Sequence, residues 1–205
     1  MQEPSNLGAP TEAAWSYGDV PPPHRRRHRW LTLPSSSVVV LALFLPFFKV
    51  CGEPKLAIQL PMFCSPHVIA ALVFAATLAR PRAHGAYALA LRIIIWITVA
   101  VFLYIAMNAF ADGDLLEPLP LLGLVALVGL VSAVFSRGEP EVVVARCGAS
   151  AGVTSVLWFG AVALSKDGLW GAWVSAIAAS AMTIGCGWWW YEAEARVPPP
   201  ARLLP

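Results

Sequence analysis

The sequence predicts an all-α fold: a polytopic membrane helix bundle with six transmembrane helices and both termini in the cytoplasm. The first observation is composition, because 58% of the 205 residues are apolar and only 13% are charged. An ordinary soluble domain is about 45–50% apolar and about 25% charged. The mean hydropathy of +0.67 agrees. The second observation is a series of apolar segments of about membrane-spanning length, and the third is the sorting of Arg and Lys between the loops that join them.

Both ends of the chain are polar and contain runs of proline. Residues 1–30 have no apolar periodicity and end in the basic cluster Arg25, Arg26, Arg27 and Arg29. Residues 192–205 contain a second run of three prolines. Segments of this composition cannot bury enough apolar surface to fold, so both are predicted to be disordered tails. We interpret His24 and His28, which flank the arginines, as solvated. The membrane domain is then residues 31–191.

A bilayer-spanning helix needs about 20 apolar residues. Pro34, Pro66, Pro118 and Pro120 fall at the starts of segments, where a missing N–H costs little. The first segment is interpreted as an uncleaved anchor, since no small-residue cleavage site follows it. The six candidate spans are residues 31–48, 65–79, 87–110, 115–135, 147–164 and 169–191.

The second segment is short for a full crossing, and the positive-inside rule decides its topology. If all six segments cross, the arginines lie on the cytoplasmic side, with Arg92 about one turn into the third span. Lys49, Lys55 and Lys166 then lie outside. If the second segment did not cross, Arg80 and Arg82 would face outward and the sorting would fail. The sequence therefore predicts six crossings.

Two cysteines, Cys51 and Cys64, fall in the first outer loop, on the oxidising side of a bacterial or secretory membrane. A bridge between them would close a loop of roughly 15 residues, so a disulfide is favoured over two unpaired thiols. A metal site that adds His67 has irregular ligand spacing and is a weak alternative. Cys147 and Cys186 lie near the inner ends of the last two spans, where the cytoplasm is reducing, and are interpreted as small packing residues.

Small residues recur at helical spacing in the last two spans. Such stripes let helices approach closely in a membrane, where lipid tails remove the hydrophobic drive for association. Packing inside one chain is favoured, and a homo-oligomer interface on the same stripe is the alternative. The predicted helix-packing residues are Gly148, Gly152, Gly171, Ser175, Ala179, Thr183 and Gly187.

No Asp, Glu, Lys or His lies at the centre of any predicted span, and no nucleotide-binding, metalloprotease or serine-hydrolase motif is present. We therefore predict no enzyme activity, no cofactor, no metal ion and no nucleic-acid partner. The outer acidic group Asp112, Asp114 and Glu117 is interpreted as ordinary acidic loop ends rather than as a cation site. The basic cluster acts as a topology determinant and also favours anionic lipid headgroups.

The favoured function is a non-enzymatic accessory or scaffold protein of a bacterial inner membrane. Its partners would be the lipid bilayer and either a second copy or another membrane protein. The alternative is a passive channel or small-solute transporter. A membrane enzyme or cofactor protein that uses Cys51, Cys64 and His67 is the weakest hypothesis. A channel would need a polar lining, for which the candidates are Thr98, Asn108, Ser132, Thr154, Ser155, Ser175 and Thr183.

Overall fold

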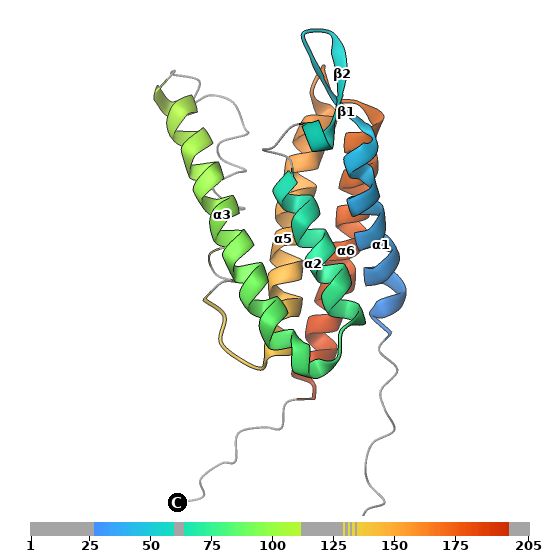
Figure 1. Ribbon diagram of the computed structural model, residues 1–205, viewed down its shortest axis with the longest axis vertical. Coiled ribbons are helices and arrows are strands. Elements are labelled where there is room, and N and C mark those ends of the chain that lie inside the picture. The colour runs from blue at the N-terminus through green and yellow to red at the C-terminus, as the bar shows by residue number, and fades with distance from the viewer. Residues whose placement is uncertain are drawn as a thin grey trace, which may run out of the picture.

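The computed structural model describes residues 27–59, 64–111, 129, 131, 133 and 135–196. Helices dominate this part of the chain, which confirms the all-α class (Figure 1). The α-helices are α1 (Arg29–Leu41), α2 (Cys64–Leu78), α3 (His84–Ala111), α5 (Pro140–Leu164) and α6 (Trp170–Glu194). Short 3₁₀ turns η1 (Ala42–Phe44), η2 (Ala57–Gln59) and η4 (Pro81–Ala83) and one hairpin, β1 (Pro46–Val50) with β2 (Glu53–Leu56), complete it.

Two stretches of helix are long and apolar enough to cross a membrane, Pro81–Val101 and Pro140–Leu164. They support association with a membrane. Helices α1 and α2 have 13 and 15 residues. Both are shorter than a helix that crosses a membrane, which needs about 20 residues. The predicted fourth span, 115–135, lies outside the described residues except for positions 129, 131, 133 and 135. Six crossings are therefore not confirmed.

The first predicted span, 31–48, is wrong in its second half. Helix α1 ends at Leu41, and the chain continues through η1 into strand β1, which begins at Pro46. Proline cannot donate a helical hydrogen bond, and it disfavours helical angles in the residue before it. Leu45 accordingly adopts extended angles, with φ −93° and ψ 151°. The apolar residues 46–48 thus build a strand rather than the end of a helix.

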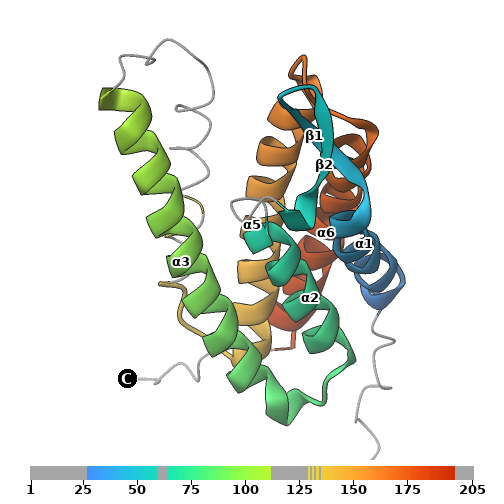
Figure 2. The same ribbon diagram turned by 45° about the horizontal axis from the view of Figure 1, so that its top comes forward.

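The hairpin turns at Cys51 and Gly52, with φ values of +53° and +85°. A two-residue hairpin turn with positive φ at both positions matches the right-handed twist of the strands. Strand β1 also binds the α5–α6 loop on its other side. The Lys49 N–H donates to the Asp167 carbonyl oxygen (2.9 Å), and the Leu169 N–H donates to that of Phe47 (3.1 Å). The hairpin is thereby fixed over one end of the bundle (Figure 2).

The antiparallel pair α5 and α6 forms the centre of the bundle. Helices α1 and α2 pack beside it, and α3 contacts α2 and α5 at the edge (Figure 1). Close approach depends on glycine. A Cβ built on Gly185 of α6 would lie 3.0 Å from the backbone nitrogen of Thr32 in α1. Buried Val73, Leu91 and Met182 fill the space between the helices.

Charged residues divide between the two ends of the molecule. Arg27, Arg82, Arg146 and Arg196 lie at one end, which we call the arginine end, where the N-terminus of α1 meets the C-terminus of α6. Lys49, Lys55 and Lys166 lie in the hairpin and the adjacent α5–α6 loop, at the hairpin end. The sequence predicts that the arginines and the lysines lie on opposite sides of a membrane, and their separation between the two ends of the bundle is consistent with that prediction.

Candidate functional site

The candidate site is a group of interacting polar side chains at the arginine end, which we call the Trp189 cluster. Its members are His28, His84, Glu141, Trp189, Glu192 and Arg196. They come from the residue before α1, the first residue of α3, the first turn of α5, the last turns of α6 and the turn that follows α6. Trp189, Glu192 and Arg196 are three and four residues apart, so the helical repeat brings them to one side.

Trp189 is the hub of this cluster and is only 1% exposed. The His28 ring stacks on it with the centroids 4.9 Å apart and an interplanar angle of 3°. The His84 ring meets it edge-on at 5.8 Å. The indole Nε1–H donates to Oε1 of Glu141 at 2.9 Å. A buried indole needs such an acceptor for its N–H group, so this contact satisfies Trp189 and links α6 to α5.

Two carboxylates, Glu141 and Glu192, connect the end of α6 to α5 and to the residue before α1. Glu141 accepts hydrogen bonds from Nη1 of Arg196 on both oxygens, at 3.2 and 3.1 Å. Glu192 Oε2 lies 2.8 Å from Nδ1 of His28. Burial lowers the pKa of His28, and this effect outweighs the opposite influence of the Glu192 hydrogen bond and charge. Neutral His28 therefore donates its Nδ1–H to Glu192 at neutral pH.

A second ion pair borders the cluster. Arg146 of α5 pairs with Glu194 of α6, and its guanidinium lies 4.9 Å from the ring centroid of Trp190. Hydrogen bonds from Trp190 and Arg146 hold the pKa of Glu194 below its ordinary value. Because Glu194 is exposed and Arg146 is only partly buried, this pair contributes little to stability. It marks the same junction of α5 and α6.

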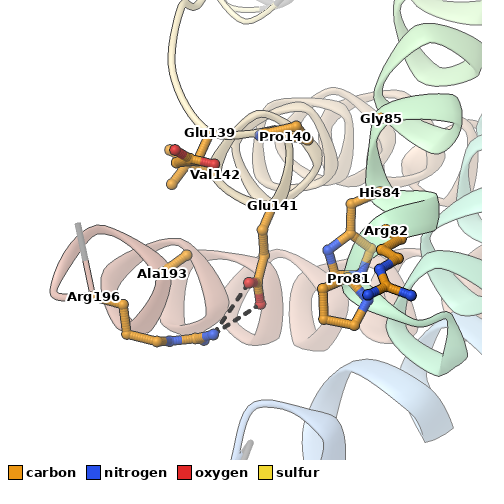
Figure 3. A pocket seen from close by; sticks show the side chains of 10 residues that line it. All are labelled: Pro81, Arg82, His84, Gly85, Glu139, Pro140, Glu141, Val142, Ala193 and Arg196. Atoms are coloured by element: carbon orange, nitrogen blue, oxygen red, sulfur yellow. Dashed lines mark hydrogen bonds and ion pairs between the residues drawn. The ribbon is translucent and has the colours of Figure 1, made fainter.

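A cleft of about 550 Å³ opens beside the cluster, between the starts of α3 and α5 and the end of α6 (Figure 3). Its lining carries equal numbers of Arg and Glu side chains. Figure 3 shows the Glu141–Arg196 ion pair with Glu139 above it and Arg82 to its right, beside His84. The lining residues are Pro81, Arg82, His84, Gly85, Glu139, Pro140, Glu141, Val142, Ala193 and Arg196.

The arrangement is suited to holding segments together. The ring stack, the indole hydrogen bond and the carboxylate contacts join four separate segments of the chain. Among the described residues, no three His, Cys, Asp or Glu side chains are grouped so that they could hold a metal ion. The candidate cation ligands Asp112, Asp114 and Glu117 lie outside the described residues.

The predicted cysteine pair occupies the hairpin end. Cys51 is a free, exposed thiol in the hairpin turn, and Cys64 begins α2 with its Sγ 3.9 Å from the Ala57 carbonyl oxygen. The bridge is not formed in this structure and stays a prediction. His67 is buried between aromatic rings, 6.3 Å from the Phe47 centroid and 5.1 Å from that of Phe159.

The predicted helix-packing residues lie mostly between helices of the same chain. A Cβ on Gly148 would lie 2.8 Å from Sγ of Cys186, and one on Gly152 would lie 3.1 Å from Cα of Thr183. A Cβ on Gly171 would lie 2.9 Å from Cβ of Leu45. Ser175 and Ala179 are fully buried. Gly187 differs, because nothing lies within 4 Å of the position its Cβ would take.

The basic cluster is described only in part. Arg25 and Arg26 lie outside the described residues, whereas Arg27 is exposed and Arg29 is half-buried. The expectation that His28 is solvated is wrong, since it is 1% exposed. His24 lies outside the described residues. Sequence reasoning missed the Trp189 cluster because its members are far apart in the chain. The one local signal is Trp189, Glu192 and Arg196 at a spacing that repeats along one helical face.

Comparison of the chain with protein-family models, with curated proteins and with solved structures finds no match.

Proposed function

We propose that this chain is a multi-pass protein of a bacterial inner membrane that acts as a non-enzymatic accessory or scaffold protein through the packing of its helices. The proposal rests on the acceptors to which the Ser and Thr hydroxyl groups of the helices donate their hydrogen bonds. In the described helices, most Ser and Thr side chains donate to the carbonyl oxygen of the residue four positions earlier in the same chain. Among the described residues these hydroxyls are used within their own helices rather than turned toward one another.

Five of the seven candidate channel-lining residues behave in this way. Thr98 bonds to Ile94, Thr154 to Ser150, Ser155 to Ala151, Ser175 to Gly171 and Thr183 to Ala179, at 2.7–3.0 Å. The Asn108 side chain and Ser132 lie outside the described residues. A solute in a pore needs polar groups that can replace its water, and a hydroxyl that donates to its own helix has no O–H left to donate to a solute. This favours a sealed bundle over the channel alternative.

The distribution of charge supports the membrane placement. The arginine end would face the cytoplasm by the positive-inside rule. Arg92, about two turns into α3, reaches back so that its Nη2 donates to the Ser136 carbonyl oxygen at 2.7 Å. Long cationic side chains near a membrane interface reach toward the polar side in this manner. The His28–Glu192 contact holds the start of α1 beside the end of α6, which supports a common, cytoplasmic side for both.

Flux through the purified protein tests the proposal directly. The full chain is reconstituted into liposomes, and release of glycerol, K⁺ and protons is compared with empty liposomes, with gramicidin as a positive control for the ions. We expect rates equal to those of empty liposomes. Protein-dependent flux of any of the three, proportional to the amount reconstituted, would overturn the sealed-bundle proposal in favour of a channel.

A second experiment tests the scaffold role. A photo-crosslinking residue is placed in the native membrane at exposed positions of α3 and α6, such as Ile97 and Ile184. We expect a discrete adduct with a second polypeptide, either another copy or a different membrane protein, from at least one position. Adducts with lipid only, from every exposed position on both helices, would contradict a scaffold.

A further inference from the structure

A shallow apolar groove of about 360 Å³ lies between α1 and α6, on the surface of the bundle. Each helix contributes residues at positions i, i+3, i+4 and i+7, so one face of each helix forms a wall. The Ser35 hydroxyl, the polar side chain of the lining, donates to the Leu31 carbonyl oxygen at 2.6 Å. The lining residues are Leu31, Pro34, Ser35, Val38, Val174, Ile177, Ala178 and Ala181.

An exposed cation, Arg27, precedes the arginine end of this groove. Arg27 lies four residues before the lining residue Leu31, about one helical turn. Among the described residues its guanidinium has no ion pair, and Glu192 of α6 is held by His28, the residue next to Arg27. The apolar groove is therefore followed along α1 by an exposed positive charge.

We propose that the groove holds one acyl chain of an anionic phospholipid of the inner leaflet, with the lipid phosphate at Arg27. The inference rests on the proposed membrane placement. An apolar slot that is followed by a cation is complementary to a molecule with an apolar tail and an anionic head.

The length of the groove agrees with this occupant. Seven residues along a helix rise by about 10 Å, which is the span of the groove on each wall. Small side chains, Ala178 and Ala181 on α6 and Ser35 on α1, keep the slot open, whereas Leu31, Val38 and Ile177 border it. A larger side chain at a small position should therefore fill the space that the acyl chain occupies.

The test uses the full chain in nanodiscs that contain equal amounts of phosphatidylglycerol and phosphatidylcholine with identical acyl chains. The protein is released into mild detergent, and retained lipid is counted by native mass spectrometry. We expect one retained lipid, with phosphatidylglycerol preferred about five-fold, the ratio expected of one basic residue near the surface.

Three variants and one control separate tail from headgroup binding. Ala181→Leu on α6 and Val38→Phe on α1 fill the slot independently, and each should lose most of the retained lipid. Arg27→Gln should keep a lipid but show a clearly reduced preference for phosphatidylglycerol, while Arg25, Arg26 and Arg29 of the basic cluster remain. Ala100→Leu, an exposed position of α3, is the matched control and should behave as the unmodified chain.

Two outcomes would overturn the lipid site: unchanged retention in both slot-filling variants, or an unchanged preference in Arg27→Gln. Solute flux does not enter this measurement, so a chain that conducts glycerol but retains the lipid would overturn the scaffold alone. A chain that does not float with lipid vesicles would overturn both proposals.

Discussion

Trp189 acts as a connector rather than as a membrane-interface anchor. In sequence it belongs to a run of aromatic residues at the end of the last predicted span, where aromatic belts are common. In the structure its neighbours Trp188 and Trp190 are partly exposed, while Trp189 is buried and contacts His28, His84 and Glu141. The helical repeat turns one residue of the run inward, and that residue determines how four segments meet.

The indole N–H of Trp189 should contribute measurably to stability. Trp189→Phe keeps the aromatic stack on His28 but removes the hydrogen bond to the Glu141 carboxylate. Hydrogen bonds to charged groups contribute about 1.5–3 kcal/mol, so we expect a clear fall in the thermal midpoint in detergent. Trp188→Phe, at a position 42% exposed, is the control and should change little. Equal shifts in the two variants would contradict the role of Trp189.

His28 should make stability fall in mild acid. Burial lowers its pKa in the folded chain, so below about pH 6.5 the unfolded chain binds a proton that the folded chain does not. The stabilisation is therefore complete above this value and is lost as the pH falls toward the lowered pKa. We expect the thermal midpoint to drop more between about pH 7.5 and about pH 5.5 in the unmodified chain than in His28→Gln. The other histidines are common to both proteins. The same drop in both would rule out His28 as the cause.

At the scale of elements, the sequence predicts helices better than it predicts their ends. The apolar segments locate the described helices α1, α2, α3, α5 and α6, because apolar runs of that length in a chain so poor in charge favour helix. The polar ends of the helices are not predicted in this way, because the prediction follows only the apolar residues. Helix α5 begins at Pro140, seven residues before the predicted start, and α6 continues to Glu194. Those extra turns carry Glu141, Glu192 and Glu194, so the error in the boundaries also concealed the candidate site.

The hairpin was missed for a related reason. Residues 46–48 are as apolar as the helix before them, so composition alone extends the span. Pro46 and the Cys51-Gly52 pair carry the opposite signal, since proline ends a helix and an X-Gly pair suits a tight hairpin turn. The binding of β1 to the α5–α6 loop is a long-range contact that no local pattern predicts.

The contact between α5 and α6 should be intolerant of added volume at Gly152. A Cβ there would lie 3.1 Å from the backbone of Thr183, which cannot move without shifting α6. We expect Gly152→Ala to destabilise the chain by about 1–3 kcal/mol. Gly160→Ala, in the same helix, meets nothing within 4 Å and should be neutral or slightly stabilising. Thermal unfolding of the two variants makes the comparison, and a neutral Gly152→Ala would refute the close packing.

The cysteine pair tests how the hairpin end is fastened. If Cys51 and Cys64 are bridged in an oxidising compartment, as the sequence predicts, neither reacts with maleimide until the protein is reduced. Mass spectrometry of the labelled chain measures this. Cys147 and Cys186 are buried and should stay unlabelled in the folded protein under both conditions. Labelling of both Cys51 and Cys64 without reductant would show that the two cysteines are not bridged.

At the scale of the whole molecule, the sorting of charge links sequence, fold and function. The sequence predicts that arginines and lysines face opposite sides of a membrane. In the described residues the two kinds of cation lie at opposite ends of one bundle, with His28 and Glu192 joining the start of α1 to the end of α6 at the arginine end. Two helices meet the length and hydropathy of a crossing. The structure supports membrane association, and the number of crossings remains a sequence-based prediction.

Sidedness is the most direct test of the proposed bundle, in which the arginine end faces the cytoplasm. Single cysteines are placed in a cysteine-free chain at Arg82 and Arg137, at the arginine end, and at Lys55 and Lys166, at the hairpin end. Each variant is labelled with a membrane-impermeant maleimide in right-side-out and in inverted vesicles. We expect positions 55 and 166 to react only in right-side-out vesicles, and positions 82 and 137 only in inverted ones. Labelling of both ends from the same side, or of every position from both sides, would contradict the account.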